Sequence, residues 1–142
     1  MKGRFFLDSN ILVYTFSRQD PEKRVLAQRL VQKALESQRG AISWQVVQEF
    51  LNVAQRKFPA TFTPAHLKIY LDQFLSPLCQ VYPSIELYRT AVNITERWQY
   101  SFYDALILAS ACESGSQTLY TEDLQHGQEL LGLQIINPFL VS

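Results

Sequence analysis

The sequence SFYDALILASACESGSQTLYTEDLQHG, residues 101–127, predicts a buried helix followed by a short strand. Ser101 is a suitable N-cap for this helix, and Gly115 is a suitable end for it. The helical residues between them carry almost no charge, so a sheet and other helices must cover this helix. Asp104 lies at the entrance of the helix and Asp123 lies just past the strand. The two acids are therefore expected either to share one cavity or to have two separate structural roles.

The rest of the chain alternates short apolar strands with helices in the same way. Strands are predicted at residues 4–7, 41–43, 79–81, 117–120 and 133–136. Helices are predicted at residues 11–16, 22–38, 44–57, 63–75, 85–98 and from 101 onward. Gly40 is expected to end the second helix, and Pro77 is expected to stop the fourth. This alternation predicts an α/β fold, in which a parallel sheet of short strands carries helices on both faces.

Length and composition set the class of protein. A chain of 142 residues with 47% apolar residues is expected to form a single domain over residues 1–142. No apolar run approaches the roughly 20 residues of a membrane span, and the start lacks the long apolar run of a secretory signal. A cytoplasmic protein without membrane contact is expected. The formal net charge of zero gives no overall basic footprint for nucleic acid.

Four acids stand out by their position relative to the predicted strands. In an open parallel sheet, functional groups gather beyond the carboxyl ends of the strands. Asp8 lies just past the first strand, and Asp123 follows the fourth strand by two residues. Asp104 opens the helix that leads into that fourth strand. Glu49 lies two turns into the helix after the second strand, so it reaches this edge only if its helix leans over it.

Each acid also has a purely structural interpretation. Asp8 could cap the helix that follows it. Asp104 could be a capping-box acid, and Asp123 could be an ordinary turn residue. Glu49 lies among apolar residues, where a buried carboxylate is costly unless it is paired with a residue such as arginine or bound to a metal.

Four carboxylates without enough basic partners would repel one another, and a hard divalent cation resolves this conflict. Oxygen ligands suit Mg²⁺ or Mn²⁺, and Mg²⁺ commonly combines one or two carboxylates with water and phosphate. Such a site can ionise a water molecule and hold a phosphate oxygen. The acids therefore indicate metal-assisted hydrolysis of a phosphoester.

Four segments, FFLDSNILVY, VVQEF, SFYDALILASA and LYTEDL, resemble the motifs of the PIN-domain nucleases. In length and layout the chain resembles the VapC-type ribonuclease toxins of prokaryotic toxin–antitoxin pairs. The resemblance implies an acidic metal site that matches Asp8, Glu49, Asp104 and Asp123. It implies supporting roles for Asn10, Thr121 and Ser43. It also implies a PIN-like three-layer sandwich with about five parallel strands, a homodimer, an RNA substrate and a cognate antitoxin whose tail enters the site.

The expected contacts with RNA are less specific. Arg56, Lys57 and Arg97 lie near the site by chain position, although each could equally be a solvated surface charge. Tyr100 and Tyr103 flank Asp104 and could stack on a base, or they could simply pack at the helix entrance.

The leading hypothesis is a metal-dependent endoribonuclease, the toxin of a toxin–antitoxin pair. Attack by metal-activated water would leave a 5′-phosphate and a 3′-hydroxyl. The alternative is a non-catalytic PIN-like scaffold that binds RNA or a partner protein. An aspartyl-phosphate phosphatase is disfavoured, because Asn10 stands where that class has a second aspartate and no lysine follows Lys68.

Overall fold

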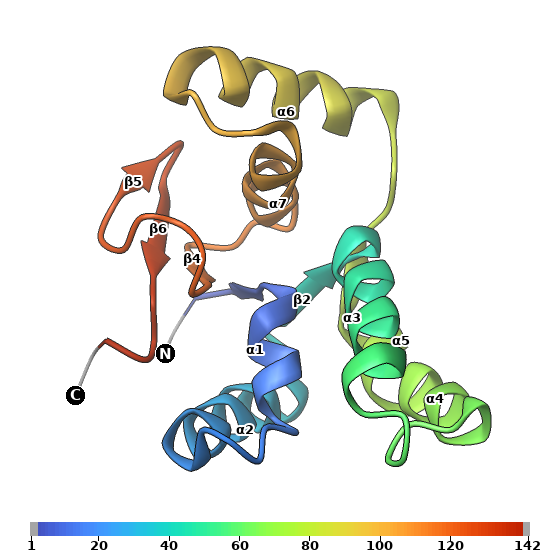
Figure 1. Cartoon of the computed structure of the whole chain (residues 1–142). Coiled ribbons are helices and arrows are strands. Elements are labelled where there is room, and N and C mark those ends of the chain that lie inside the picture. The colour runs from blue at the N-terminus through green and yellow to red at the C-terminus, as the bar shows by residue number, and fades with distance from the viewer. Residues whose placement is uncertain (1–2, 141–142) are drawn as a thin grey trace.

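Five short parallel strands form the centre of the computed structural model, which describes residues 3–140 (Figure 1). A sixth strand pairs antiparallel at one edge, and the sheet order is β3-β2-β1-β4-β6-β5. The strands are β1 (Phe5–Leu7), β2 (Gly40–Ser43), β3 (Cys79–Val81), β4 (Thr118–Tyr120), β5 (Glu129–Leu130) and β6 (Leu133–Ile136). The predicted α/β class and parallel sheet are confirmed.

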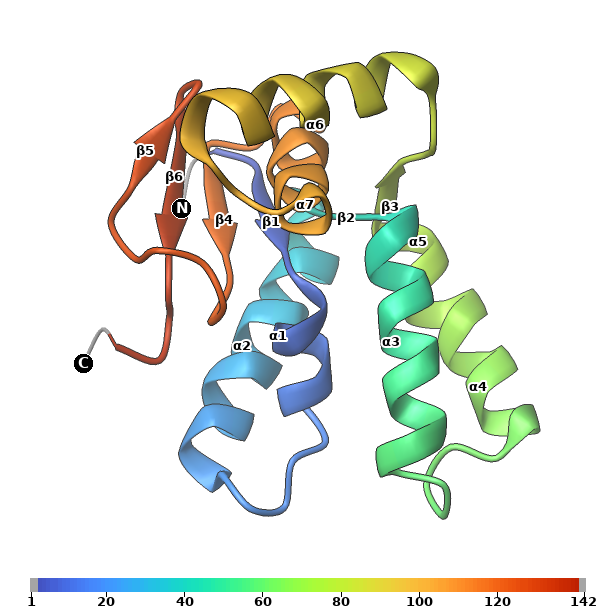
Figure 2. The same ribbon diagram turned by 45° about the horizontal axis from the view of Figure 1, so that its top comes forward.

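Helices cover both faces of the sheet, as Figures 1 and 2 show. On one side lie α6 (Ile85–Trp98) and α7 (Phe102–Glu113), and on the other lie α1 (Ser9–Tyr14) and α2 (Pro21–Ser37). Next to α1 packs α3 (Trp44–Lys57). It is followed by α4 (Pro64–Tyr70), the π-helical segment η1 (Leu71–Leu75) and the short α5 (Ser76–Leu78).

The core confirms that the helix predicted after Ser101 is buried. All residues of α7 from Ala105 to Ala111 are buried, and the three residues of β1 are at most 1% exposed. A strand buried on both faces is typical of a parallel sheet with helices on each side. No helix within residues 3–140 is long and apolar enough to cross a membrane.

Two residues that were expected to stop helices do not do so. The helix α2 ends at Ser37, and its C-cap Gln38 adopts the left-handed conformation (φ 60°). Gly40 instead begins β2, where a Cβ would come within 2.1 Å of the Cβ of Ala34. The fourth helix continues past Pro77 to Leu78, because Pro77 falls in the first turn of α5, where its missing N–H matters least.

The antiparallel strand β5 was not predicted. It has only two residues, too few for a period-2 pattern to show. Its turn into β6 places Leu131 (φ 52°) and Gly132 (φ 78°) in the left-handed region, as a tight hairpin turn of this kind requires.

Candidate active site

The carboxyl ends of β1 and β4 meet where the strand order reverses direction. The chain adds β2 and β3 on one side of β1 and then places β4 on the other side. Such a switch point is where open parallel sheets bind ligands. Asp8 directly follows β1, and Thr121, Glu122 and Asp123 directly follow β4. The topology therefore brings two of the predicted acids to one place.

Asp8 is the most buried of these acids, with 6% of its surface exposed. It is the N-cap of α1, and its Oδ1 accepts a hydrogen bond of 2.7 Å from the Ser9 amide. Its Oδ2 accepts one of 2.8 Å from the Thr121 hydroxyl. Burial, together with the nearby charges of Glu49 and Asp123, raises the pKa of Asp8 to about 6 despite these bonds. The carboxylate is thus held in place but is costly to ionise.

Glu49 reaches this edge because α3 packs against α1. The Ser9 hydroxyl donates to Glu49 Oε1 at 3.0 Å. Gln45, one turn earlier on α3, donates from Nε2 to Glu49 Oε2 at 3.2 Å. Both oxygens of Glu49 are therefore fixed in direction, and neither forms an ion pair with any residue from 3 to 140.

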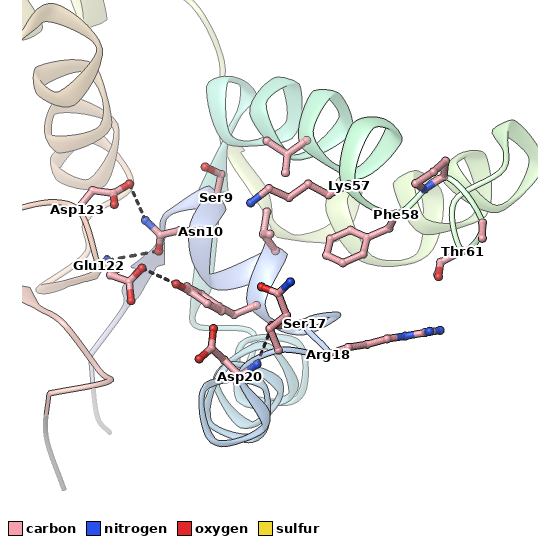
Figure 3. Close-up of a pocket in the computed structure, with 16 residues that line it drawn as sticks. Ser9, Asn10, Ser17, Arg18, Asp20, Lys57, Phe58, Thr61, Glu122 and Asp123 are labelled. Carbon is pink, nitrogen blue, oxygen red and sulfur yellow. Dashed lines mark hydrogen bonds between the residues drawn. The ribbon is translucent and has the colours of Figure 1, made fainter.

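Asp123 is held by Asn10 (Figure 3). The Asn10 side-chain amide donates to Asp123 Oδ2 at 3.1 Å, and Asn10 Oδ1 accepts from the Glu122 amide at 3.3 Å. The Asp123 amide donates to the Thr121 hydroxyl oxygen at 3.1 Å. Asn10 and Thr121 thus take the supporting positions expected for them.

Asp104 stands apart from the other three acids. Its amide donates to the capping hydroxyl of Ser101 at 3.4 Å, and its half-buried carboxylate has no hydrogen-bond or ion-pair partner within residues 3–140. The link to the rest of the site runs through Gln45, whose Nε2 also donates to the Tyr103 carbonyl at 3.2 Å. The capping-box explanation is not supported, since the carboxylate does not return to the Ser101 amide.

The possible metal ligands of the site are carboxylate oxygens, which fit a hard divalent cation. Among the described residues only two ion pairs form, Lys23–Glu122 and Arg89–Glu86, and neither involves the four acids. Uncompensated carboxylate oxygens are the ligands that Mg²⁺ and Mn²⁺ prefer. No three acidic, histidine or cysteine side chains of residues 3–140 lie close enough to hold one metal ion together. A site of one or two carboxylates, which Mg²⁺ commonly uses, fits this arrangement.

A family model of the PIN domain matches residues 5–128. The chain belongs to the PIN domain family. All four motif segments lie wholly within the matched residues. A comparison with curated protein sequences gives no significant match.

Solved structures with the same fold include the following three. One is a chain of a toxin–antitoxin complex from Klebsiella pneumoniae, with a TM-score of 0.64, 22% identity and coverage of 94% of this chain and 96% of that one. VapC20 of Mycobacterium tuberculosis is described as a toxin that cleaves the sarcin–ricin loop. It has a TM-score of 0.61 and 21% identity, and the match covers 84% of this chain and 89% of that one. VapBC2 of Rickettsia felis, bound to a promoter DNA fragment, has a TM-score of 0.59 and 19% identity, and the match covers 92% of this chain and 96% of that one. At these identities the likeness establishes the fold.

Beside the acids of this PIN domain lies a cavity of about 850 Å³. It begins at Ser9, Asn10 and Asp123 and extends along α1 to Arg18 and Thr61. Figure 3 shows the Lys57 side chain extending toward Ser9 from the far wall. A phosphate chain lying in this cavity would meet a cation close to the acids.

The other predicted residues lie elsewhere. Arg56 is exposed at the end of α3 and does not line this cavity. Arg97 lies over the ring of its neighbour Trp98, 4.4 Å from its centroid. Ser43 is 2% exposed and caps α3 by accepting from the Val46 amide at 3.3 Å, so it positions the helix that carries Glu49.

Several residues of the site were missed. Ser9 and Gln45 hold Glu49, although nothing in a lone serine or a helical glutamine signals this role. Glu122 accepts from the Tyr14 hydroxyl at 2.6 Å and pairs with Lys23 at 2.6 Å. Partial burial opposes ionisation of Glu122, but Lys23 and Tyr14 together lower its pKa. This pairing ties the turn that carries Asp123 to α1 and α2.

Proposed function

We propose that this PIN domain is a divalent-metal-dependent endoribonuclease that hydrolyses RNA phosphodiester bonds. The single observation that carries the proposal is the environment of Asp8. A buried carboxylate is held at the switch point by Ser9 and Thr121, lies near the charges of Glu49 and Asp123, and forms no ion pair within residues 3–140. A protein rarely keeps such a charge unless a ligand compensates it.

The residues of the chain divide the chemistry between them. One or two of the carboxylates of Asp8, Glu49, Asp123 and Asp104 would bind Mg²⁺ or Mn²⁺ directly, and the others would reach it through water. The bound cation would polarise the phosphate and lower the pKa of a water nucleophile. Ser9 and Gln45 orient Glu49, while Asn10 orients Asp123. Lys57 binds a phosphate oxygen of the RNA along the cavity. The 2′-hydroxyl takes no part, so the products carry a 5′-phosphate and a 3′-hydroxyl.

We further propose that the chain is the toxin of a toxin–antitoxin pair. Support comes from the three solved structures above, each of a protein or complex from such a system and each matched over most of both chains. A cognate antitoxin and a homodimeric assembly belong to this proposal. Expression in a bacterial host should then arrest growth, and co-expression of the protein encoded next to it should restore growth.

The test of the enzyme proposal is cleavage of RNA by purified protein. Cleavage is expected with Mg²⁺ or Mn²⁺ and should stop with EDTA. The Asp8→Asn variant, purified in the same way, reports any contaminating ribonuclease. Equal cleavage by wild type and variant, or persistence in excess EDTA, overturns the proposal.

One observation favours the alternative of a non-catalytic RNA- or partner-binding scaffold. Asp104 lies apart from the other acids, and no three of the described acids surround a common point. A scaffold would bind RNA equally well with and without Mg²⁺ and would cut it in neither condition.

A further inference from the structure

A second pocket adjoins the acids through residues other than those of the 850 Å³ cavity that Lys57 lines, here called the Lys57 cavity. It has a volume of about 290 Å³ and lies between the start of α3, the β3–α6 connection, α6 and the start of α7. These segments can be followed in Figures 1 and 2. Five aromatic side chains line it: Trp44, Tyr82, Tyr88, Phe102 and Tyr103. We call this group the aromatic pocket.

The aromatic pocket contains every exposed aromatic side chain of residues 3–140. Trp44 is 46% exposed, Tyr82 is 55% exposed and Tyr103 is 68% exposed. All the other aromatic rings in this range are buried or half-buried. Exposing five rings in one place is costly for the free protein, and an exposed apolar patch of this kind commonly marks a binding site.

The contacts among these rings are tilted or edge to face. Trp44 and Tyr82 are tilted by 53° with centroids 5.6 Å apart. Phe102 and Tyr103 meet edge to face, at 74° and 5.5 Å. Because no two of these five rings stack face to face, a flat ligand can lie against a ring without displacing another ring.

The aromatic pocket adjoins the acids through Gln45. This side chain lines the pocket and donates both to Glu49 and to the carbonyl of Tyr103, the residue before Asp104. The Lys57 cavity adjoins the acids from Ser9, Asn10 and Asp123. A strand crossing the acids therefore has a cation on one side and open ring faces on the other.

We propose that the aromatic pocket binds an unpaired nucleobase of the RNA, next to the phosphodiester that is cut. This inference rests on the proposed ribonuclease function and specifies its substrate as unpaired RNA. Unstacked bases lie on aromatic side chains in proteins that recognise single-stranded RNA, and the stacking tolerates different bases. Paired RNA keeps its bases stacked inside the duplex, so it cannot fill this pocket.

Tryptophan fluorescence tests the proposal, because Trp44 and Trp98 are the only tryptophans. The Trp98→Phe variant leaves Trp44 as the single reporter. It is titrated in EDTA, where no cleavage occurs, with a short single-stranded RNA. The same titration uses an oligonucleotide of equal length with abasic ribose at every position, and a duplex. Saturable quenching by the single strand, with little quenching by the abasic strand or the duplex, is the expected result.

Two further variants separate ring stacking from general contact with this face. Tyr103→Leu removes an exposed ring and keeps apolar bulk, and it should weaken binding of the single strand about tenfold. In the cleavage assay it should raise KM more than it lowers kcat. Ile85→Ala is the matched control, because Ile85 is 70% exposed at the start of α6 and does not line the pocket. It should bind like the parent protein.

Each contrary result has a defined meaning. Cleavage of RNA by wild type without quenching at Trp44, or equal quenching by the abasic strand, overturns the nucleobase pocket and leaves the ribonuclease standing. If Tyr103→Leu changes the molar mass in solution, measured by light scattering, the face joins two copies of the chain and the assignment is wrong. Absence of both cleavage and binding refutes the ribonuclease and the pocket together.

Discussion

At the scale of single residues, the ionised carboxylate of Asp8 destabilises the folded protein, although the proposed function needs it. Its pKa of about 6 in the folded protein lies above the ordinary value of 3.8. The folded state therefore binds this proton more tightly than the unfolded chain does. Stability from this group is present below about pH 4 and is lost as pH rises through the folded pKa. A bound cation would offset that loss.

The Asp8→Asn variant should therefore be more stable than wild type at pH 8 in EDTA. The pKa difference sets an upper limit of roughly 3 kcal/mol, and loss of charge-assisted bonds from Ser9 and Thr121 reduces the gain to about 1 kcal/mol. At pH 4, where Asp8 is largely neutral, the gain should vanish. Urea unfolding at both pH values checks this, and a variant that is less stable at pH 8 would contradict it.

Substitution of Gln45 should reduce RNA cleavage much more than it reduces the stability of the fold. Its Nε2 bonds Glu49 and the Tyr103 carbonyl, while its Oε1 is the one buried side-chain polar atom within residues 3–140 without a partner. If the Gln45 amide were flipped, its oxygen would face the Glu49 carboxylate and the Tyr103 carbonyl, which are both hydrogen-bond acceptors. These two acceptors therefore fix the orientation of the Gln45 amide.

Gln45→Met keeps the length of the side chain and removes both bonds. Unfolding free energy should fall by only about 1 kcal/mol, because the unpartnered oxygen is removed as well. RNA cleavage should fall by more than tenfold, and a higher Mn²⁺ concentration should be needed for half-maximal rate. Gln55→Met, which is exposed on the same helix and lines neither the Lys57 cavity nor the aromatic pocket, is the control. Equal effects of the two variants would remove Gln45 from the site.

At the scale of elements, the start of α7 distinguishes a metal ligand from a cap. Ser101 caps this helix through the amide of Asp104, so the Asp104 carboxylate is free for another role. Asp104→Asn should melt at the same or a higher temperature than wild type in EDTA, and it should gain less stability from added Mg²⁺.

Ser101→Ala should show the opposite pattern. Loss of the cap costs about 1 kcal/mol, while the response to Mg²⁺ stays as in wild type. Thermal melts of the three proteins with and without Mg²⁺ decide between the roles. If Asp104→Asn melts lower in EDTA and responds to Mg²⁺ like wild type, Asp104 is a structural acid.

Local signals explain why most elements were predicted from the sequence. Ser43, Thr63, Ser84 and Ser101 each cap the helix expected after them. The π-helical segment and β5 were not predicted, because they depend on tertiary packing and on a turn at Leu131 and Gly132. Gly40 was misread, since only the fold shows that Ala34 leaves no room for a side chain there.

The sequence singled out the four acids as candidates, but it did not reveal the hydrogen bonds that hold them. Strand connectivity brings Asp8 and Asp123 together at the switch point, and packing of α3 on α1 adds Glu49. The side chains that hold Glu49 come from α1 and α3, so no local pattern reveals them. The separation of Asp104 from the other acids is likewise a matter of how α7 packs.

At the scale of the whole molecule, the two pockets define a path for RNA across the acids. Lys57 lines the 850 Å³ cavity, whereas its neighbour Arg56 does not. Lys57→Ala should weaken RNA binding and should lower the slope of log affinity against log salt by roughly 0.7. Arg56→Ala should change neither. Binding measured across a series of salt concentrations checks this, and equal slopes for the two variants would mean that the cavity is not the path.

The central claim is that carboxylates at the β1–β4 switch point direct hydrolysis of RNA with a divalent cation. The most direct test is the chemistry of the ends left by cleavage in Mn²⁺, analysed for wild type and Asp8→Asn. We expect a 5′-phosphate and a 3′-hydroxyl from wild type and no product from the variant. A 2′,3′-cyclic phosphate, or the same product from Asp8→Asn, would contradict the account.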